Sequence, residues 1–98
     1  MATVCRVQEP PWDPGKDREN RAKHGVSFDE AREAVLDPLS RAYPDPDHSS
    51  DEPRWIVIGE SSHGRQLVVV VVTDREGKMR IISARRATKR ERHAYEDL

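Results

Sequence analysis

The apolar positions of this chain are gathered in three short blocks, over residues 55–58, 67–72 and 79–84, with polar stretches between them. The block 67–72 consists of one leucine and five valines, so it is apolar on both faces. Such a run is typical of a central strand that is covered on each side. We therefore expect three strands, over 54–59, 66–73 and 79–86, and their short connections make the sheet antiparallel.

A first helix is indicated before these strands. Asp13 is suited to the position that caps a helix, and Pro14 is suited to its first turn. Gly25 is suited to the residue that follows a helix end, because glycine adopts the left-handed conformation without strain. These signals predict a helix over 14–24.

This first helix carries a polar row. Lys16, Asn20 and His24 recur every four residues, so they lie on one side of the helix. The row is either an exposed polar face or a row that faces a functional site. His24 has the same two interpretations: a helix-terminal histidine that favours the helix dipole, or a general acid or base.

Two further helices are predicted by capping boxes. Ser27 and Thr88 are each followed three residues later by a glutamate, which is the spacing of reciprocal hydrogen bonds at a helix start. The second helix ends at Asp37, because the next residue is a proline. The third helix covers 89–96.

Two segments have weaker patterns. Residues 1–9 form either a short strand or a loose tail, and 39–43 is a further candidate strand that precedes a loop over 44–51. Together these elements predict one α+β domain over 1–98. It has two N-terminal helices, an antiparallel sheet of about four strands and a C-terminal helix, with helices on one face and arginines around the end or the opposite face.

Charge is distributed unevenly along the chain. Charged residues make up 36% of the 98 residues, yet the formal net charge is only −1. Residues 29–60 hold three arginines and nine acids, whereas 78–98 hold seven lysines and arginines and three acids. The C-terminal part therefore favours an anionic partner such as nucleic acid, unless its charges simply cover a solvated helix.

Several classes of function find no support in the sequence. No phosphate loop, dinucleotide-binding glycine pattern or zinc signature occurs, and the four histidines and one cysteine fit no metal site. We expect neither a metal nor another cofactor. The lone Cys5 and the lack of an apolar leader or membrane-spanning run predict a protein of the reducing cytoplasm.

The remaining chemistry is a cationic cluster with proton-transfer groups near it. Arginine binds phosphate bidentately and keeps its charge. RNA cleavage without a metal needs a base for the 2′-hydroxyl, cations for the phosphorane and an acid for the leaving oxygen. These requirements make Arg65, Arg85, Arg86, Glu91, His24 and Tyr95 candidates for catalysis, and Arg80, Lys89, Arg90 and Arg92 candidates for RNA contacts, with a solvated charged surface as the alternative.

The chain also resembles a known family. The resemblance runs from Trp12 through Lys23-His24-Gly25-Val26-Ser27-Phe28 to Arg80-Ile81-Ile82-Ser83-Ala84-Arg85-Arg86-Ala87-Thr88 and Tyr95. These segments are similar to the BrnT family, the toxin half of a type II toxin–antitoxin pair. The resemblance implies a RelE-like fold, metal-independent endoribonuclease activity, growth arrest and neutralisation by a BrnA-like antitoxin. It further implies a heterotetramer or larger complex that reaches operator DNA only through the antitoxin.

Two questions remain open at this level. The rival interpretation is a non-catalytic module whose basic end binds nucleic acid or an acidic partner. On a regular strand Arg80 and Arg86 share a side, and Arg85 joins them only where the pleat breaks. We therefore expect Arg85 and Arg86 to differ in effect.

Overall fold

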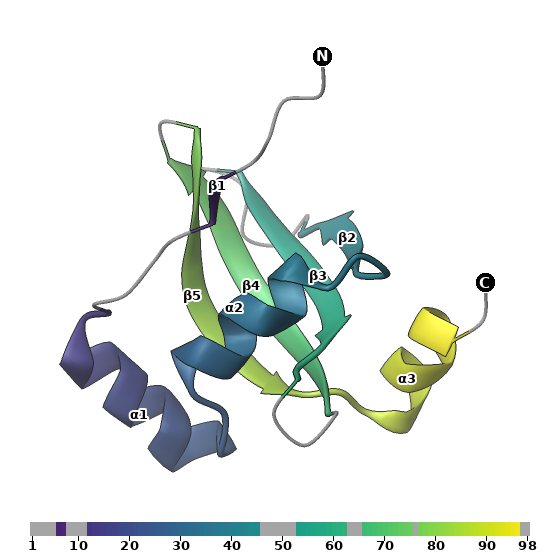
Figure 1. The fold of residues 1–98 in the computed structure, drawn as a ribbon, viewed down its shortest axis with the longest axis horizontal. Helices are drawn as coiled ribbons and strands as arrows, with labels where there is room; N and C mark the ends of the chain where they lie inside the picture. The colour runs from purple at the N-terminus through teal and green to yellow at the C-terminus, as the bar shows by residue number, and fades with distance from the viewer. Residues whose placement is uncertain (1–5, 8–11, 46–52, 63–65, 76, 97–98) are drawn as a thin grey trace.

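The computed structural model describes residues 6–7, 12–45, 53–62, 66–75 and 77–96. Its sheet has the strand order β1-β5-β4-β3-β2 (Figure 1). The strands are β1 (Arg6–Val7), β2 (Arg41–Pro44), β3 (Arg54–Glu60), β4 (Leu67–Arg75) and β5 (Lys78–Arg86). Strands β2 to β5 are antiparallel, and the two-residue β1 pairs in parallel with the start of β5.

The valine-rich strand β4 lies in the centre of the sheet, as its sequence predicts. Val68, Val70 and Val72 are fully buried on one face, and Val69 is 2% exposed on the other. A strand that is apolar on both faces gains most by lying between two others, because burial of its valines removes apolar surface from water.

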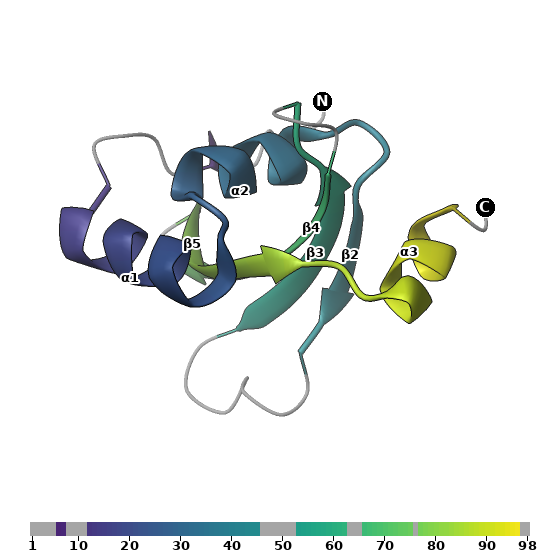
Figure 2. The same cartoon turned by 90° about the horizontal axis from the view of Figure 1, so that it is seen from below.

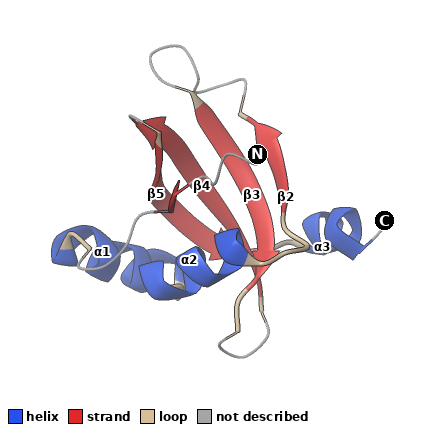
Figure 3. Cartoon of the chain, turned by 45° about the horizontal axis from the view of Figure 1, so that its top comes forward, coloured by secondary structure: helices blue, strands red, loops and turns tan. Residues whose placement is uncertain are grey.

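Three helices accompany the sheet: α1 (Pro14–His24), α2 (Phe28–Leu36) and α3 (Lys89–Glu96). Helix α2 covers one face of the sheet, α1 lies beside β5, and α3 lies near the other side of the molecule (Figure 2). Figure 3 shows the same separation of α1 and α2 from α3. None of the helices in the described ranges is long and apolar enough to cross a membrane.

The main core lies between α2 and the sheet. Phe28, Ala31 and Ala34 are buried together with apolar residues of β3, β4 and β5. Gly59 of β3 permits this close approach, since a β-carbon there would lie 1.9 Å from the backbone oxygen of Ala34. Trp12 extends the core, with its ring edge-on to Phe28 at a centroid distance of 5.9 Å.

The helix signals of the sequence are confirmed. The Asp13 carboxylate accepts from the backbone N–H of Gly15 at 2.9 Å, and Gly25 ends α1 with a φ of 70°. At α3 the box is reciprocal: Glu91 N–H donates to the Thr88 hydroxyl, and Thr88 N–H donates to the Glu91 carboxylate. These caps satisfy backbone donors that the first helical turn leaves free.

Strand boundaries differ more from the sequence prediction. The strand predicted over 39–43 begins only at Arg41, because the Asp37 side chain accepts from Leu39 N–H at 2.9 Å and folds 37–40 into a turn. Residues 6–7 of the uncertain N-terminal segment do form a strand.

Strand β5 contains an irregularity that decides where its arginines lie. Val71 pairs with Ser83 and Val72 pairs with Ile81, so Ile82 is an extra residue without a partner on β4. This β-bulge reverses the alternation of side chains. Arg80 and Arg85 therefore share the face opposite α2, and the regular alternation that pairs Arg80 with Arg86 does not occur.

Candidate functional site

The contact between α1 and β5 depends on the side chain of Asn20. This amide is 7% exposed, and its nitrogen donates to the backbone oxygens of Val26 at 2.8 Å and Ala84 at 2.9 Å. Its oxygen accepts from Ala84 N–H at 3.1 Å. The amide thus makes the two hydrogen bonds with Ala84 that a neighbouring strand would otherwise make at this point of the β5 edge. The polar row of α1 faces the sheet, and Asn20 has a structural role within it.

A cavity of about 690 Å³ opens beside this contact, between α1 and β5. The cationic side chains that line it come from three elements. They are Lys16 and Lys23 of α1, Arg54 of β3 and Arg80 of β5, and the imidazole of His24 also lines the cavity. Asp13 and Glu19 are its acids, but Asp13 caps α1 and Glu19 lies 3.2 Å from the Lys23 ammonium. The cavity therefore has an excess of positive charge.

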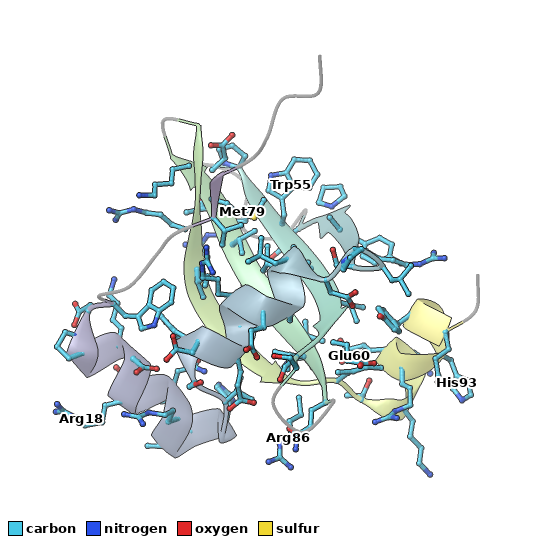
Figure 4. All side chains as sticks on the ribbon, in the orientation of Figure 1. Arg18, Trp55, Glu60, Met79, Arg86 and His93 are labelled. Carbon is cyan, nitrogen blue, oxygen red and sulfur yellow. The ribbon has the colours of Figure 1, made fainter. Side chains whose placement is uncertain are left out.

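The two ends of the cavity carry different groups. Asn20 is bonded at Ala84, and the Nη2 of Arg86 lies 3.9 Å from the point that a β-carbon on Gly25 would occupy. Helix α1 thus runs in the same direction as β5. His24 lies at the end near Arg86, which Figure 4 shows at the foot of the sheet, and Lys16 lies toward Arg80.

Arg54 is a cavity residue to which the sequence analysis assigned no role. Its Nε is buried and has no hydrogen-bond partner within the described part of the chain. An unpaired buried donor costs about 1–3 kcal/mol. Arg54 belongs to the segments that carry the family resemblance, but its position next to Thr73 and near Arg80 follows only from the pairing of strands that are distant in sequence.

Arg85, a predicted catalytic residue, has a partner of its own. Its Nη1 and Nη2 donate to the two carboxylate oxygens of Glu91 at 2.7 and 2.6 Å. Hydrogen bonds from Arg85 hold the pKa of Glu91 at about 2, below its ordinary value of 4.5. The structure thus brings these two predicted residues together as an ion pair at the start of α3.

Tyr95, another predicted catalytic residue, also has a partner. Its hydroxyl donates to Asp37 Oδ2 at 2.6 Å, and the same oxygen accepts from Glu60 N–H at 2.8 Å. The hydrogen bond to Asp37 is the main reason that the pKa of Tyr95 is raised to about 12. Tyr95 thus links α3 to the turn after α2.

The ten predicted site residues therefore fall into separate groups. His24 and Arg80 line the cavity, whereas Arg86 pairs with Val68 on the α2 face of the sheet and lies next to Gly25. Arg85, Glu91 and Tyr95 hold α3, whose cations Lys89, Arg90 and Arg92 are exposed. Arg65 lies outside the described residues. Within the described ranges, no three His, Cys, Asp or Glu side chains are grouped so as to hold a metal ion.

Fold and site together define a small α+β protein whose cationic cavity is suited to a phosphodiester. The family model described as ribonuclease toxin, BrnT, of type II toxin-antitoxin system matches residues 12–91. The chain belongs to this family of ribonuclease toxins, and its type II system pairs it with an antitoxin protein. No curated protein matches the chain.

Proposed function

We propose that this toxin is a metal-independent endoribonuclease that cleaves RNA in the cavity between α1 and β5. The observation that carries the proposal is the convergence of Lys16, Lys23, His24, Arg54 and Arg80 on one cavity of a ribonuclease toxin. A phosphodiester bound there would meet several cations and one imidazole. The cavity's own charges would then do what a metal ion does in other nucleases.

His24 is the proposed base of the reaction. Histidine is the side chain that most often acts as a general base in enzymes, and an imidazole nitrogen here would take the proton of a 2′-hydroxyl. Glu91 is unsuited to this step, because a carboxylate with a pKa of about 2 is a weak base. The 2′-oxygen then attacks the adjacent phosphorus and the bond to the 5′-oxygen breaks, leaving a 2′,3′-cyclic phosphate. Water gives a proton to the leaving 5′-oxygen, and the hydroxide that remains takes the proton from the imidazolium of His24, which restores the base.

Arg86 and Lys23 are the proposed cations for the phosphorane at the His24 end. Arg86 is the better donor, since its planar fork can bind two phosphate oxygens at once. Arg65 and the exposed α3 cations Lys89, Arg90 and Arg92 remain predicted contacts to the RNA on either side. Arg85, Glu91 and Tyr95 would act indirectly, by positioning α3.

We further propose that the antitoxin is BrnA-like and neutralises the toxin by covering the cavity with acidic side chains. The pair would form a heterotetramer or a larger complex and would bind operator DNA only through the antitoxin. The free toxin would arrest growth by cleaving RNA in the cytoplasm. Membership of a type II toxin–antitoxin family and the positive charge of the cavity support this proposal.

The decisive experiment is cleavage of RNA by the purified toxin in excess EDTA. We expect products with 2′,3′-cyclic phosphate ends, and no cleavage where the 2′-hydroxyl is replaced by hydrogen. Loss of activity in EDTA that added zinc or magnesium restores would contradict metal independence. RNA binding without any cleavage would favour the rival interpretation, a non-catalytic binding module.

A further inference from the structure

Arg54 is one of the cations that line the cavity, but none of the proton-transfer or bond-breaking steps above is assigned to it. Its Nε is buried and has no partner among the described residues, so one strong donor is held without an acceptor. Native proteins pair nearly all buried polar groups, and an exception therefore asks for an explanation. An anion bound in the cavity would supply the missing acceptor.

The register of the sheet places Arg54 close to a second arginine. Arg54 pairs with Thr73 of β4, and Thr73 pairs with Arg80 of β5. Directly opposite residues share one face of a sheet with β-carbons about 4.5–5.5 Å apart. Arg54 and Arg80 therefore flank the short side chain of Thr73 on the face opposite α2.

The surroundings of this pair are those of an anion site. Thr73 is 3% exposed, and its hydroxyl donates to the backbone oxygen of Pro53 at 2.8 Å, which fixes the chain next to Arg54. Neither arginine forms an ion pair within the described residues, whereas Arg85 is bound at both nitrogens by Glu91. Arg54 and Arg80 lie on the strands either side of β4, so an anion above Thr73 would lie within reach of both guanidinium groups.

The pair is also separate from the His24 end of the cavity. Lys16 and His24 are eight residues apart on α1, which corresponds to about 12 Å along a helix axis. Lys16 lies toward Arg80, and His24 lies toward Arg86. A single phosphate cannot reach both ends, but successive phosphates of one RNA strand can.

We infer that Arg54 and Arg80 form a second phosphate subsite, which binds a phosphate of the RNA strand other than the one that is cleaved. The assignment of the cleaved phosphate to the His24 end rests on the proposed function. The subsite itself rests on the buried donor and the strand register. It makes the toxin prefer substrates that carry a phosphate beyond the scissile bond.

The test is a binding experiment that needs no catalysis. The probe is a 2′-deoxy tetranucleotide, which lacks the attacking hydroxyl, together with versions in which one phosphate at a time is a neutral methylphosphonate. For the wild-type toxin we expect one replacement to weaken binding about tenfold through loss of the subsite contact. In Arg54→Gln the same replacement should have no further effect, as in a double-mutant cycle.

Arg18→Gln is the matched control, because Arg18 is exposed on the outer side of α1 and does not line the cavity (Figure 4). It removes the same charge and should keep the full sensitivity to the replacement. Arg80→Gln, at an exposed position, provides a second variant should Arg54→Gln fail to fold. Each subsite variant should also lower the slope of log affinity against log salt concentration by about 0.7.

The outcomes separate the subsite from the proposed function. If Arg54→Gln and Arg80→Gln bind every probe as Arg18→Gln does, the proposed subsite does not exist. This conclusion would hold whether or not the toxin cleaves RNA. If the cycle shows coupling but the toxin cleaves no RNA in EDTA, the subsite stands and the proposed reaction fails.

Discussion

At the scale of single residues, the amide of Asn20 connects parts of the chain that lie 64 positions apart. It satisfies both backbone groups of Ala84, and through Val26 it also fixes the turn between α1 and α2. The position of α1, and with it the shape of the cavity, therefore depends on one buried side chain.

We expect Asn20→Ala to destabilise the fold by about 3 kcal/mol, since several buried backbone groups lose their partners at once. The free energy of unfolding in urea measures this change. Asn20→Asp should cost at least as much, because a carboxylate cannot donate to the oxygens of Val26 and Ala84. An unchanged urea midpoint in both variants would show that α1 is held by other contacts.

His24 belongs to the same helix but is exposed, so its replacement should spare the fold. We expect His24→Gln to melt at the wild-type temperature and to cleave RNA a hundredfold more slowly or worse, as is usual for loss of a general base. His93→Gln is the matched control, because His93 is an exposed histidine on α3, away from the cavity (Figure 4). Full activity of a folded His24→Gln would remove His24 from the mechanism.

The sequence could identify residue types at this scale but not their neighbours. It selected His24, Arg80 and Arg86 by chemistry, and the structure places His24 and Arg80 in the cavity and Arg86 next to Gly25 at the end of α1. It assigned no role to Arg54, whose position relative to Arg80 is defined only by the pairing of three strands. It treated Arg85 and Glu91 as separate groups, although a strand end and a helix start bring them together.

At the scale of elements, α3 is attached mainly by polar contacts. It has no buried residue, and its links to the body include the Arg85–Glu91 pair and the Tyr95–Asp37 hydrogen bond. A helix that is held by polar contacts of this kind opens more easily than a helix that is held by a buried apolar face. The exposed cations of α3 can therefore move together with it.

The Arg85–Glu91 pair makes the attachment of α3 dependent on pH. The pKa of Glu91 is about 2 in the folded protein and 4.5 as its ordinary value. A lowered folded pKa adds stability above pH 4.5, and this stability is lost as the pH falls toward 2. Because the Arg85 side chain is 44% exposed, solvent screening limits the contribution to about 1 kcal/mol.

Amide hydrogen exchange in α3 measures this contribution. We expect α3 to open more easily in Glu91→Gln than in the wild type by about 1 kcal/mol at pH 7. The difference should shrink between pH 4.5 and 2 and vanish below that range. A difference that stays constant with pH would mean that the charge of Glu91 contributes nothing.

Elements themselves are largely predictable where a side chain marks their ends. Asp13, Ser27 and Thr88 each cap a helix at the predicted residue. The predicted start of β2 was wrong, because the Asp37 side chain accepts a hydrogen bond from Leu39 N–H just beyond the end of α2. A hydrophobic pattern gives the period of a strand, but the bulge at Ile82 arises from packing between strands and leaves no local signal.

At the scale of the whole molecule, a chain with a net charge of −1 presents a cavity lined mainly by cations. The acids are concentrated elsewhere in the sequence, over 29–60. Such an arrangement steers an anionic strand toward one place and leaves the remaining surface less attractive to it. The location of the cavity could not be predicted, since it needs α1 to lie against an edge of the finished sheet.

The antitoxin should compete for the same place. We expect acetylation of Lys16 and Lys23, measured by mass spectrometry, to be suppressed in the complex with a BrnA-like antitoxin. Lys78 is exposed on the β4–β5 hairpin outside the cavity and is the control. Equal acetylation of all three lysines in a stable complex would place the antitoxin elsewhere, and neutralisation would then be indirect.

The bulge in β5 has a consequence for insertions and deletions. Because Ile82 has no partner on β4, removing it leaves Ile81 opposite Val72 and Ser83 opposite Val71. Every arginine of the strand then keeps its face, so we expect the deletion of Ile82 to fold and to bind RNA. Deletion of Val70 from the regular part of β4 should instead reverse half of that strand and prevent folding, as circular dichroism would show. A related chain that lacks this one residue would therefore place its arginines on the same faces of the strand. A sequence alignment without a gap would nevertheless match those arginines to the wrong residues of this chain.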